Sequence, residues 1–338
     1  MSKGLTSNTG RQILKTYEVK TVMTTGIRTF HNSQRHQTPQ QRAASSASNP
    51  FLLDSKHGDF NKIQASRPKF DRSLPVEVSK APDPEWKYGK GVNDTSGQHL
   101  QHIEIDPYRL DRSMISNYKL LISGIPRPIS FVSTTSKDGK RNLAPFSYFQ
   151  VVDHDPPILV IGFSARNDRP KDTRKNLVET GECVISVVSE HMIEAVNSTS
   201  LDVPHGISEW EFSGLYAAPS STVRPQRVKD AIFSIEGKLL EMKELSYGGH
   251  GQAGKPTGAL AIIEATRFWV REDALNETHD DIDLLRMKPL VQLGGISYGR
   301  VRETFELPRP KLEVALKDEA QGLRQFLEPG DKNEPSTE

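Results

Sequence analysis

Short β-branched and apolar runs separated by turn residues dominate the middle of this chain. Residues 129–135 (ISFVSTT) form one such run, and residues 142–151 follow after an Asp-Gly pair at 138–139. Two extended runs joined by an Asp-Gly turn predict a β-hairpin. The apolar runs 158–163 (ILVIGF) and 183–188 (CVISVV) predict buried strands. The middle of the chain is therefore expected to form a sheet that begins with a hairpin.

The following segments add strands and only a few helices. Residues 173–179 predict a helix that ends at Gly181 and turns Leu177 and Val178 inward, and residues 191–197 predict a second helix. Six or seven strands with two or three short helices lack the regular alternation of a parallel α/β sheet. We therefore predict a mostly β fold, a closed and mostly antiparallel barrel. Its remaining strands are predicted at 231–241, 258–270 and 290–298.

The apolar content is low for a globular chain and is unevenly distributed. Of the 338 residues, 35% are hydrophobic and 7% aromatic, whereas globular domains usually contain more apolar residues. The predicted strands and helices all fall within residues 100–315, which we interpret as one folded domain. Residues 38–99 hold repeated prolines and no hydrophobic period, so they predict a disordered or extended linker, and 316–338 predict a polar C-terminal tail.

The first 37 residues have the composition of a mitochondrial presequence. Residues 1–50 contain seven basic side chains, one acid and fourteen Ser or Thr, and this composition is typical of import signals. Residues 28–33 (RTFHNS) resemble the Arg-x-Phe-x-x-Ser pattern of presequences trimmed in two steps, which places a mature end near Gln37 or Thr38. We therefore expect the mitochondrial matrix as the location. The alternative is a basic, disordered tail on a cytoplasmic protein.

Charge and cysteine content exclude several classes of protein. Lys and Arg total 44 against 43 Asp and Glu, so the basic excess of a nucleic-acid binder is missing. A single cysteine, Cys183, excludes a disulfide framework within the chain. Its apolar neighbours predict an inert core thiol rather than a nucleophile. No apolar run is long enough to predict a transmembrane helix.

Several motifs of catalysis and ligand binding are missing from the sequence. No Gly-x-Gly-x-x-Gly opens a helix, and neither a phosphate-binding P-loop nor a Gly-x-Ser-x-Gly elbow occurs. The glycine-rich stretch 247–255 predicts a mobile loop between strands. No metal site is predicted, because no cluster has metal-ligand spacing. We expect His154, His205 and His250 to be structural or exposed, and 277–283 (ETHDDID) to form a solvated loop or helix start.

Hydroxyl and basic groups gather instead on one strand and at one helix start. Lys171, Asp172 and Thr173 open the predicted helix, whose first N–H groups and partial positive charge attract phosphate. Thr173 is expected to cap that helix, and Lys171 adds a positive charge. Ser133 and Thr134 on the first strand carry hydroxyls able to reach the same phosphate. The alternative is a plain threonine cap beside a solvated lysine.

Six blocks in fixed order make the chain similar to a known family. They are 124–129 (GIPRPI), 132–134 (VST), 138–139 (DG), 142–149 (NLAPFSYF), 156–157 (PP) and 171–176 (KDTRKN). In order and spacing they resemble the flavin reductase-like family, flavoproteins with the FMN-binding split-barrel fold. The resemblance covers about residues 105–305 and leaves out the first hundred residues.

The resemblance implies a fold and a set of cofactor-binding residues. It implies a split β-barrel of antiparallel, Greek-key type, and a homodimer with FMN at the subunit interface. At the FMN phosphate it places Ser133, Thr134, Lys171 and Thr173, with Asp172 in the same cofactor-binding set. Along the isoalloxazine ring it places Asn142, Ala144, Pro145 and Ser147.

The resemblance also implies a reaction class. It predicts an FMN-dependent oxidoreductase, most simply an NAD(P)H:flavin reductase that acts on free flavin or a small molecule. The alternatives are a flavoprotein oxygenase with a small organic substrate and a non-catalytic protein that binds or stores FMN. No catalytic side chain is predicted, because in flavoproteins the cofactor itself carries the hydride or the electrons.

Overall fold

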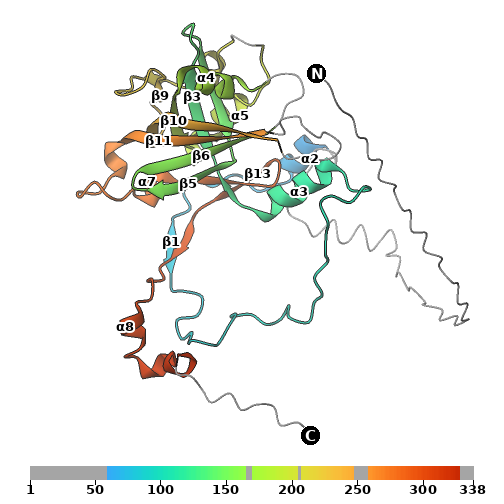
Figure 1. Cartoon of the computed structure of the whole chain (residues 1–338), viewed down its shortest axis with the longest axis vertical. Helices are drawn as coiled ribbons and strands as arrows, with labels where there is room; N and C mark the ends of the chain where they lie inside the picture. Colours follow the sequence, from blue (N-terminus) through green and yellow to red (C-terminus); the bar gives the residue numbers. More distant parts are fainter. Residues whose placement is uncertain (1–58, 165–169, 205–206, 247–257, 328–338) are drawn as a thin grey trace, which may run out of the picture. The chain divides into compact units, whose positions relative to one another are not determined.

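The computed structural model describes residues 59–164, 170–204, 207–246 and 258–327, and a seven-stranded antiparallel sheet forms its centre (Figure 1). The hydrogen-bonded order of the strands is β4, β3, β7, β10, β11, β6, β5. Their bounds are β3 Ser130–Thr135, β4 Arg141–Phe146, β5 Phe149–His154, β6 Pro157–Ser164, β7 Glu182–Val187, β10 Phe233–Leu245 and β11 Gly258–Val270.

The predicted first hairpin is confirmed. β3 and β4 pair in register from Ser130 opposite Phe146 to Thr134 opposite Asn142. In the turn that joins them, Gly139 has a φ of 80°, a conformation that favours glycine. The hairpin fixes which side chains of the two strands share a face, because residues directly opposite each other point to the same side of a sheet.

The predicted strand 142–151 is two strands, β4 and β5, and this corrects the sequence interpretation. The chain bends at Ser147 and Tyr148, after which β5 pairs with β6 instead of β3. β4 and β5 are the two end strands of the sheet, although only two residues separate them. Seven strands laid flat span about 29 Å, whereas a two-residue link spans about 10 Å. The sheet therefore curls into a barrel, and the predicted mostly β, antiparallel barrel is confirmed.

Two apolar clusters lie on the two faces of the first hairpin. The barrel interior holds Val132, Leu159, Ile161, Ile185 and Ile263 among others. The opposite face carries Phe131 and Leu143. Helices α5 (Ile193–Ser198) and α6 (Glu209–Ser213) cover it with Val196 and Trp210. β3 is buried on both faces, and this explains why its sequence is a continuous β-branched run rather than an alternation of apolar and polar residues.

Helix α4 (Asp172–Thr180) follows β6 and packs against β3 and β4 (Figure 1). It ends as predicted at Gly181, whose φ is 70°. Leu177 is fully buried, but Val178 is 59% exposed, so the prediction that both face inward is wrong for Val178. Thr173 does not cap the helix either, because Lys171 occupies the N-cap and provides no capping side chain.

A three-stranded sheet adjoins the barrel and corrects a second strand prediction. The predicted strand 290–298 is a hairpin of β12 (Leu290–Leu293) and β13 (Ser297–Arg300), with β12 paired to β2 (Arg127–Pro128). Gly294, with a φ of 69°, reverses the chain between the two strands.

Several elements lie outside the strands predicted from sequence. Helix α3 (Met114–Gly124) was not predicted, and the Ser113 hydroxyl caps it by accepting the Ser116 N–H. Within the predicted linker, β1 (Glu77–Ser79) pairs in parallel with β14 (Glu303–Phe305). The remaining elements are α2 Phe60–Ala65, η2 Glu190–Met192, α5 Ile193–Ser198, α6 Glu209–Ser213, β8 Ala217–Ala218, β9 Arg227–Val228, η3 Glu272–Ala274, α7 Leu284–Met287, α8 Leu312–Ala315, η4 Glu319–Gln321 and η5 Arg324–Phe326.

Candidate functional site

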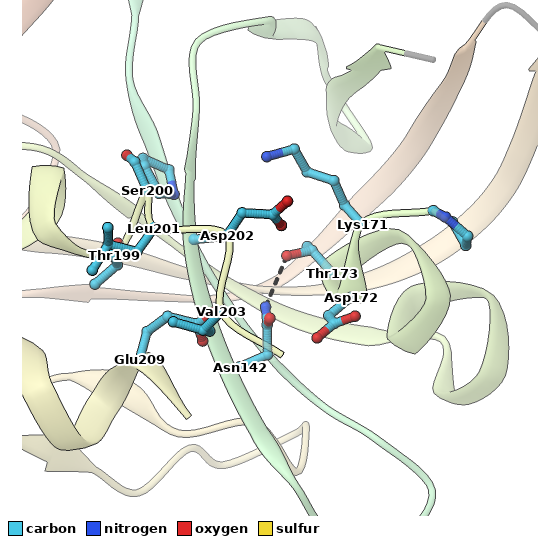
Figure 2. Close-up of a pocket in the computed structure, with 13 residues that line it drawn as sticks. Asn142, Lys171, Asp172, Thr173, Thr199, Ser200, Leu201, Asp202, Val203 and Glu209 are labelled. Carbon is cyan, nitrogen blue, oxygen red and sulfur yellow. Dashed lines mark hydrogen bonds between the residues drawn. The ribbon is translucent and has the colours of Figure 1, made fainter. Parts of the chain in front are cut away.

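A pocket lies where the first turn of α4 meets β4 and the segment 199–203. Figure 2 shows Thr199–Val203 facing Lys171–Thr173 across it, with Asp202 directed toward the start of α4. The pocket therefore joins three parts of the chain that are far apart in sequence. Its lining residues are Asn142, Ala144, Pro145, Pro170, Lys171, Asp172, Thr173, Thr199, Ser200, Leu201, Asp202, Val203 and Glu209.

A buried network of amides and hydroxyls forms the floor of this pocket. Asn142 Nδ2 donates to Oγ1 of Thr173 across 2.8 Å and lies 3.4 Å from Oγ1 of Thr134. Asn176 Nδ2 donates to the same Thr134 hydroxyl across 3.0 Å. All four side chains are buried, and Oδ1 of Asn176 has no hydrogen-bond partner among the described residues. A buried acceptor without a donor costs about 1–3 kcal/mol, and Asn176 lies behind the residues that line the pocket rather than among them.

The N-terminus of α4 supplies the positive end of the pocket. No side chain of the described residues caps this helix, whose first turn therefore presents backbone N–H groups and a partial positive charge. The Lys171 ammonium lies 5.6 Å from the centre of the Phe146 ring, above the barrel interior. Together these groups form an environment that stabilises an anion.

Glu209 brings a buried carboxyl group to the other side of the pocket. It is the first residue of α6, and its Oε2 accepts the backbone N–H of Leu143 across 3.0 Å. Burial raises the pKa of Glu209, and the nearby carboxylate of Asp172 adds to this effect. The side chain holds β4 in place directly between the pocket residues Asn142 and Ala144.

The charge of the pocket is mixed rather than simply basic. Lys171 is its only cationic lining residue within the described part of the chain, whereas Asp172, Asp202 and Glu209 bring carboxyl groups. An anion bound here therefore depends on directed hydrogen bonds from amides and hydroxyls as well as on net charge.

The structure gathers most of the predicted site residues. Six of them line the pocket: Asn142, Ala144, Pro145, Lys171, Asp172 and Thr173. Thr134 lies behind them and supports Asn142 and Asn176 through its hydroxyl.

Ser133 and Ser147 lie apart from the pocket. Ser133 is buried opposite Leu143, on the face of β3 that looks away from Thr134, because successive residues of a strand point to opposite sides. The two neighbouring hydroxyls therefore do not converge on one phosphate. Ser147, at the corner between β4 and β5, accepts a hydrogen bond from Arg127 Nε across 3.2 Å.

Sequence reasoning missed Pro170, Glu209 and the segment 199–203. Glu209 and Leu143 are 66 positions apart in sequence, so no local motif predicts the contact between them. A buried acidic residue at the start of a short helix is visible only once α6 packs on β4.

The other candidate residues from the sequence have no catalytic or metal-binding arrangement where the structure describes them. Cys183 is fully buried, and burial raises the pKa of its thiol to about 12, as expected of a core residue. No group of three or more His, Cys, Asp or Glu in the described ranges is placed to hold a metal ion. His154 is exposed, and Asn276 ties the acidic loop together through Asp280 and Asp281.

Some predictions fall outside the described residues. These are the presequence at 1–37, the glycine-rich stretch 247–255, and the histidines His205 and His250. Among the helices that the structure describes, none is both long and apolar enough to cross a membrane.

Comparison with known proteins identifies the family of this chain. Residues 122–291 match the flavin reductase like domain, and the chain belongs to this family. The matched segment contains the whole seven-stranded sheet, α4 and the pocket.

Solved structures agree with this assignment. Nitrilotriacetate monooxygenase component B of Bacillus cereus is 32% identical with a TM-score of 0.57, over 62% of this chain and all of that one. The 2-nitrobenzoate 2-nitroreductase NbaA of Pseudomonas fluorescens is 27% identical with a TM-score of 0.53, over 63% and 98%. A flavin reductase with a split barrel domain from Shewanella frigidimarina shares the fold at 21% identity and a TM-score of 0.51, over 59% and 95%. Family and neighbours support a flavin-related oxidoreductase activity with the split-barrel fold.

Proposed function

We propose that this protein is an FMN-dependent oxidoreductase that accepts reducing equivalents from NAD(P)H and passes them to free flavin or a small organic acceptor. The observation that carries the proposal is the uncapped N-terminus of α4, which opens beside Lys171 onto a pocket floored by Asn142 and Thr173. A helix N-terminus with a lysine and a hydroxyl suits the phosphate of FMN.

The donors and acceptors of the pocket suit the rest of the FMN chain. Thr173 Oγ1 accepts a bond from Asn142, so its own proton is available to a phosphate oxygen. The carboxyl groups of Asp202 and Glu209 line the pocket, accept hydrogen bonds and suit ribityl hydroxyls. This set also favours FMN over inorganic phosphate, because the ribityl chain of FMN brings several hydroxyl donors to the carboxyl groups.

The residues of β4 have a supporting role in this proposal. Bound FMN supplies the hydride and electron transfer. Ala144 and Pro145 offer a short, flat backbone surface at the pocket, and Glu209 fixes this strand through the Leu143 N–H. Ser147 is positioned by Arg127, whose guanidinium also donates to the Ile122 and Gly294 carbonyls. These residues would hold the ring of bound FMN in place.

A second candidate differs in the electron acceptor. The neighbour NbaA is named as a nitroreductase, and its similarity favours direct reduction of an organic substrate on the bound flavin. Both candidates share the cofactor site, and the acceptor distinguishes them. A rate with nitroaromatic compounds that exceeds the rate with free FMN would favour the second candidate.

We also propose that the protein is a homodimer. Helix α3 exposes Ile115 and Leu121, and β5 exposes Val151 and Val152, each more than half accessible. Burial and the nearby Tyr118 of α3 raise the pKa of Tyr148, which directly precedes β5, so α3 lies near the start of β5. Apolar side chains gathered in this way mark an interaction surface. Light scattering should give twice the chain mass, and a Val152→Glu substitution should give the monomer.

For localisation we propose the mitochondrial matrix, on the basic and hydroxyl-rich composition of residues 1–50. A fluorescent reporter fused after residue 50 should enter mitochondria, and a reporter that stays diffuse in the cytosol would refute the proposal.

Anaerobic reduction tests the proposed activity. The purified protein should bind FMN with the absorbance of an oxidised flavin, and NADH or NADPH should bleach this absorbance under argon. Readmission of oxygen or addition of the acceptor should restore it. A protein that binds FMN but is not bleached by either nucleotide would instead be a storage protein.

A further inference from the structure

A second cavity lies between the segment before β1 and the end of β13, and it shares no residue with the α4 pocket. Its volume is about 150 Å³, room for a few water molecules or one small ion. Most of its walls lie outside the matched family segment 122–291. The lining residues are Arg72, Ser73, Leu74, Pro75, Val76, Glu190, Leu285, Lys288, Pro289, Arg300, Val301 and Arg302.

Two arginines form the fixed wall of this cavity. The buried Glu190 carboxylate accepts from Arg300 across 3.5 Å and from Arg302 across 3.2 Å. Arg300 also donates to the Asp71 carbonyl across 2.7 Å, and Arg302 donates to the Leu74 carbonyl. The two guanidinium groups thus fasten residues 71–74 to the barrel domain.

The cavity is also lined by basic side chains that take no part in these bonds. Neither Arg72 nor Lys288 makes a side-chain hydrogen bond or ion pair with any residue that the structure describes. The Nε–H of Arg302 is buried and has no acceptor in the described part of the chain. Four cations, Arg72, Lys288, Arg300 and Arg302, line the cavity with one carboxylate, Glu190. The Asp71 carboxylate lies outside the lining, near Arg300 and Arg302. A buried donor without an acceptor, beside two cations that pair with no described residue, leaves room for an anion.

We propose that this cavity binds a small oxyanion, a free phosphate or a small carboxylate, between Arg72, Lys288 and Arg302. Arg72 comes from the N-terminal segment, whereas Lys288 ends α7 of the barrel domain. The bound anion therefore links the two parts, and its binding stabilises the docked position of residues 71–76.

Thermal unfolding of the full chain tests this proposal. Phosphate, and in a separate series acetate, is titrated at an ionic strength held constant with sodium chloride. We expect a saturable rise in Tm with at least one of the two, and the better ligand tells whether phosphate or carboxylate is preferred. Equal, unsaturated effects of both salts would show only the general action of excluded salts and would overturn the proposal.

Single substitutions localise the effect. Arg72→Gln and Lys288→Gln each remove a cation that pairs with no described residue, so folding should persist. Each should lower the affinity for the anion roughly tenfold or more, as expected for the loss of a charge-assisted hydrogen bond. Lys288→Arg keeps the positive charge and should retain binding. Arg309→Gln, at an exposed position, is the control. An anion response that is the same in all four variants would refute the site.

The α4 pocket also attracts phosphate, so it needs its own control. In the double variant Lys171→Ala with Thr173→Ala, the Tm response to the anion should persist. If this double variant abolishes the response while Lys288→Gln does not, the anion binds at the α4 pocket and the proposed cavity is refuted.

Discussion

Asn142 on β4 donates a hydrogen bond to Thr173 in the first turn of α4, across 2.8 Å and with both side chains buried. The two residues are 31 positions apart in sequence. The bond sets the distance between the strand and the helix N-terminus, and so it defines the width of the candidate FMN site.

Removal of this bond should affect both folding and FMN binding. Asn142→Ala leaves the Thr173 hydroxyl without its buried donor, whereas the Thr134 hydroxyl keeps the Asn176 donor, and such a loss costs about 1–3 kcal/mol. We expect a lower free energy of unfolding in urea and a roughly tenfold weaker affinity for FMN. A variant with wild-type stability and affinity would show that the network does not shape the site.

The Glu209 carboxyl group should make stability depend on pH. Burial raises its pKa in the folded state, so the folded chain holds this proton at a pH where the unfolded chain has lost it. The stabilisation is complete below the ordinary glutamate pKa and is lost as pH rises through the folded-state value. Glu209→Gln should therefore gain stability relative to wild type as pH increases from mildly acidic to neutral.

Urea unfolding at several pH values measures this difference. The amide oxygen introduced by Glu209→Gln still accepts a hydrogen bond from the Leu143 N–H, so the fold should be retained. The matched control is Glu211→Gln, which lies on the same helix but is exposed. Parallel stability curves for wild type and Glu209→Gln would contradict the raised pKa.

The Cys183 thiol should be unreactive in the folded protein. It is fully buried, and its pKa of about 12 leaves almost no thiolate at pH 8. A thiol-specific chromogenic reagent should label no cysteine in the native protein and one per chain after unfolding in urea. Rapid labelling of the native protein would argue for an accessible, functional thiol.

Gly237 should be intolerant of a side chain. A Cβ at this position would lie 2.5 Å from Cγ2 of Ile263 in the barrel interior. Overpacking of a core costs about 1–3 kcal/mol, so Gly237→Ala should lower the free energy of unfolding by this amount. Gly97→Ala, where a Cβ meets nothing within 4 Å, is the control and should have little effect.

Local patterns predicted the elements whose signals are local. The Asp-Gly pair predicted the hairpin of β3 and β4, and Gly181 predicted the end of α4. Both predictions succeeded because each turn needs a residue with a positive φ, a conformation that favours glycine. The barrel followed from many short strands with few helices. The site residues Asn142, Lys171 and Thr173 were found because a helix N-terminus and a resemblance to known motifs pointed to the same place.

Features that depend on tertiary packing were not predictable in this way. Ser147 and Tyr148 carry no turn signal, so the corner between β4 and β5 was missed. Glu209 enters the site only because α6 covers the hairpin. Ser133 was grouped with Thr134 although adjacent strand residues point to opposite faces. Long-range packing decides each of these cases.

Titration with FMN tests the central claim most directly. Wild type, Lys171→Ala with Thr173→Ala, and the control Lys175→Ala are compared by flavin fluorescence. Lys175 lies on the same helix but pairs with Glu179 at 3.6 Å, outside the pocket. We expect the double variant to bind FMN about tenfold more weakly or worse, since charge-assisted bonds contribute roughly 1.5–3 kcal/mol each, and the control to bind like wild type. Equal affinity of all three proteins for FMN, or no binding by wild type, would contradict the account.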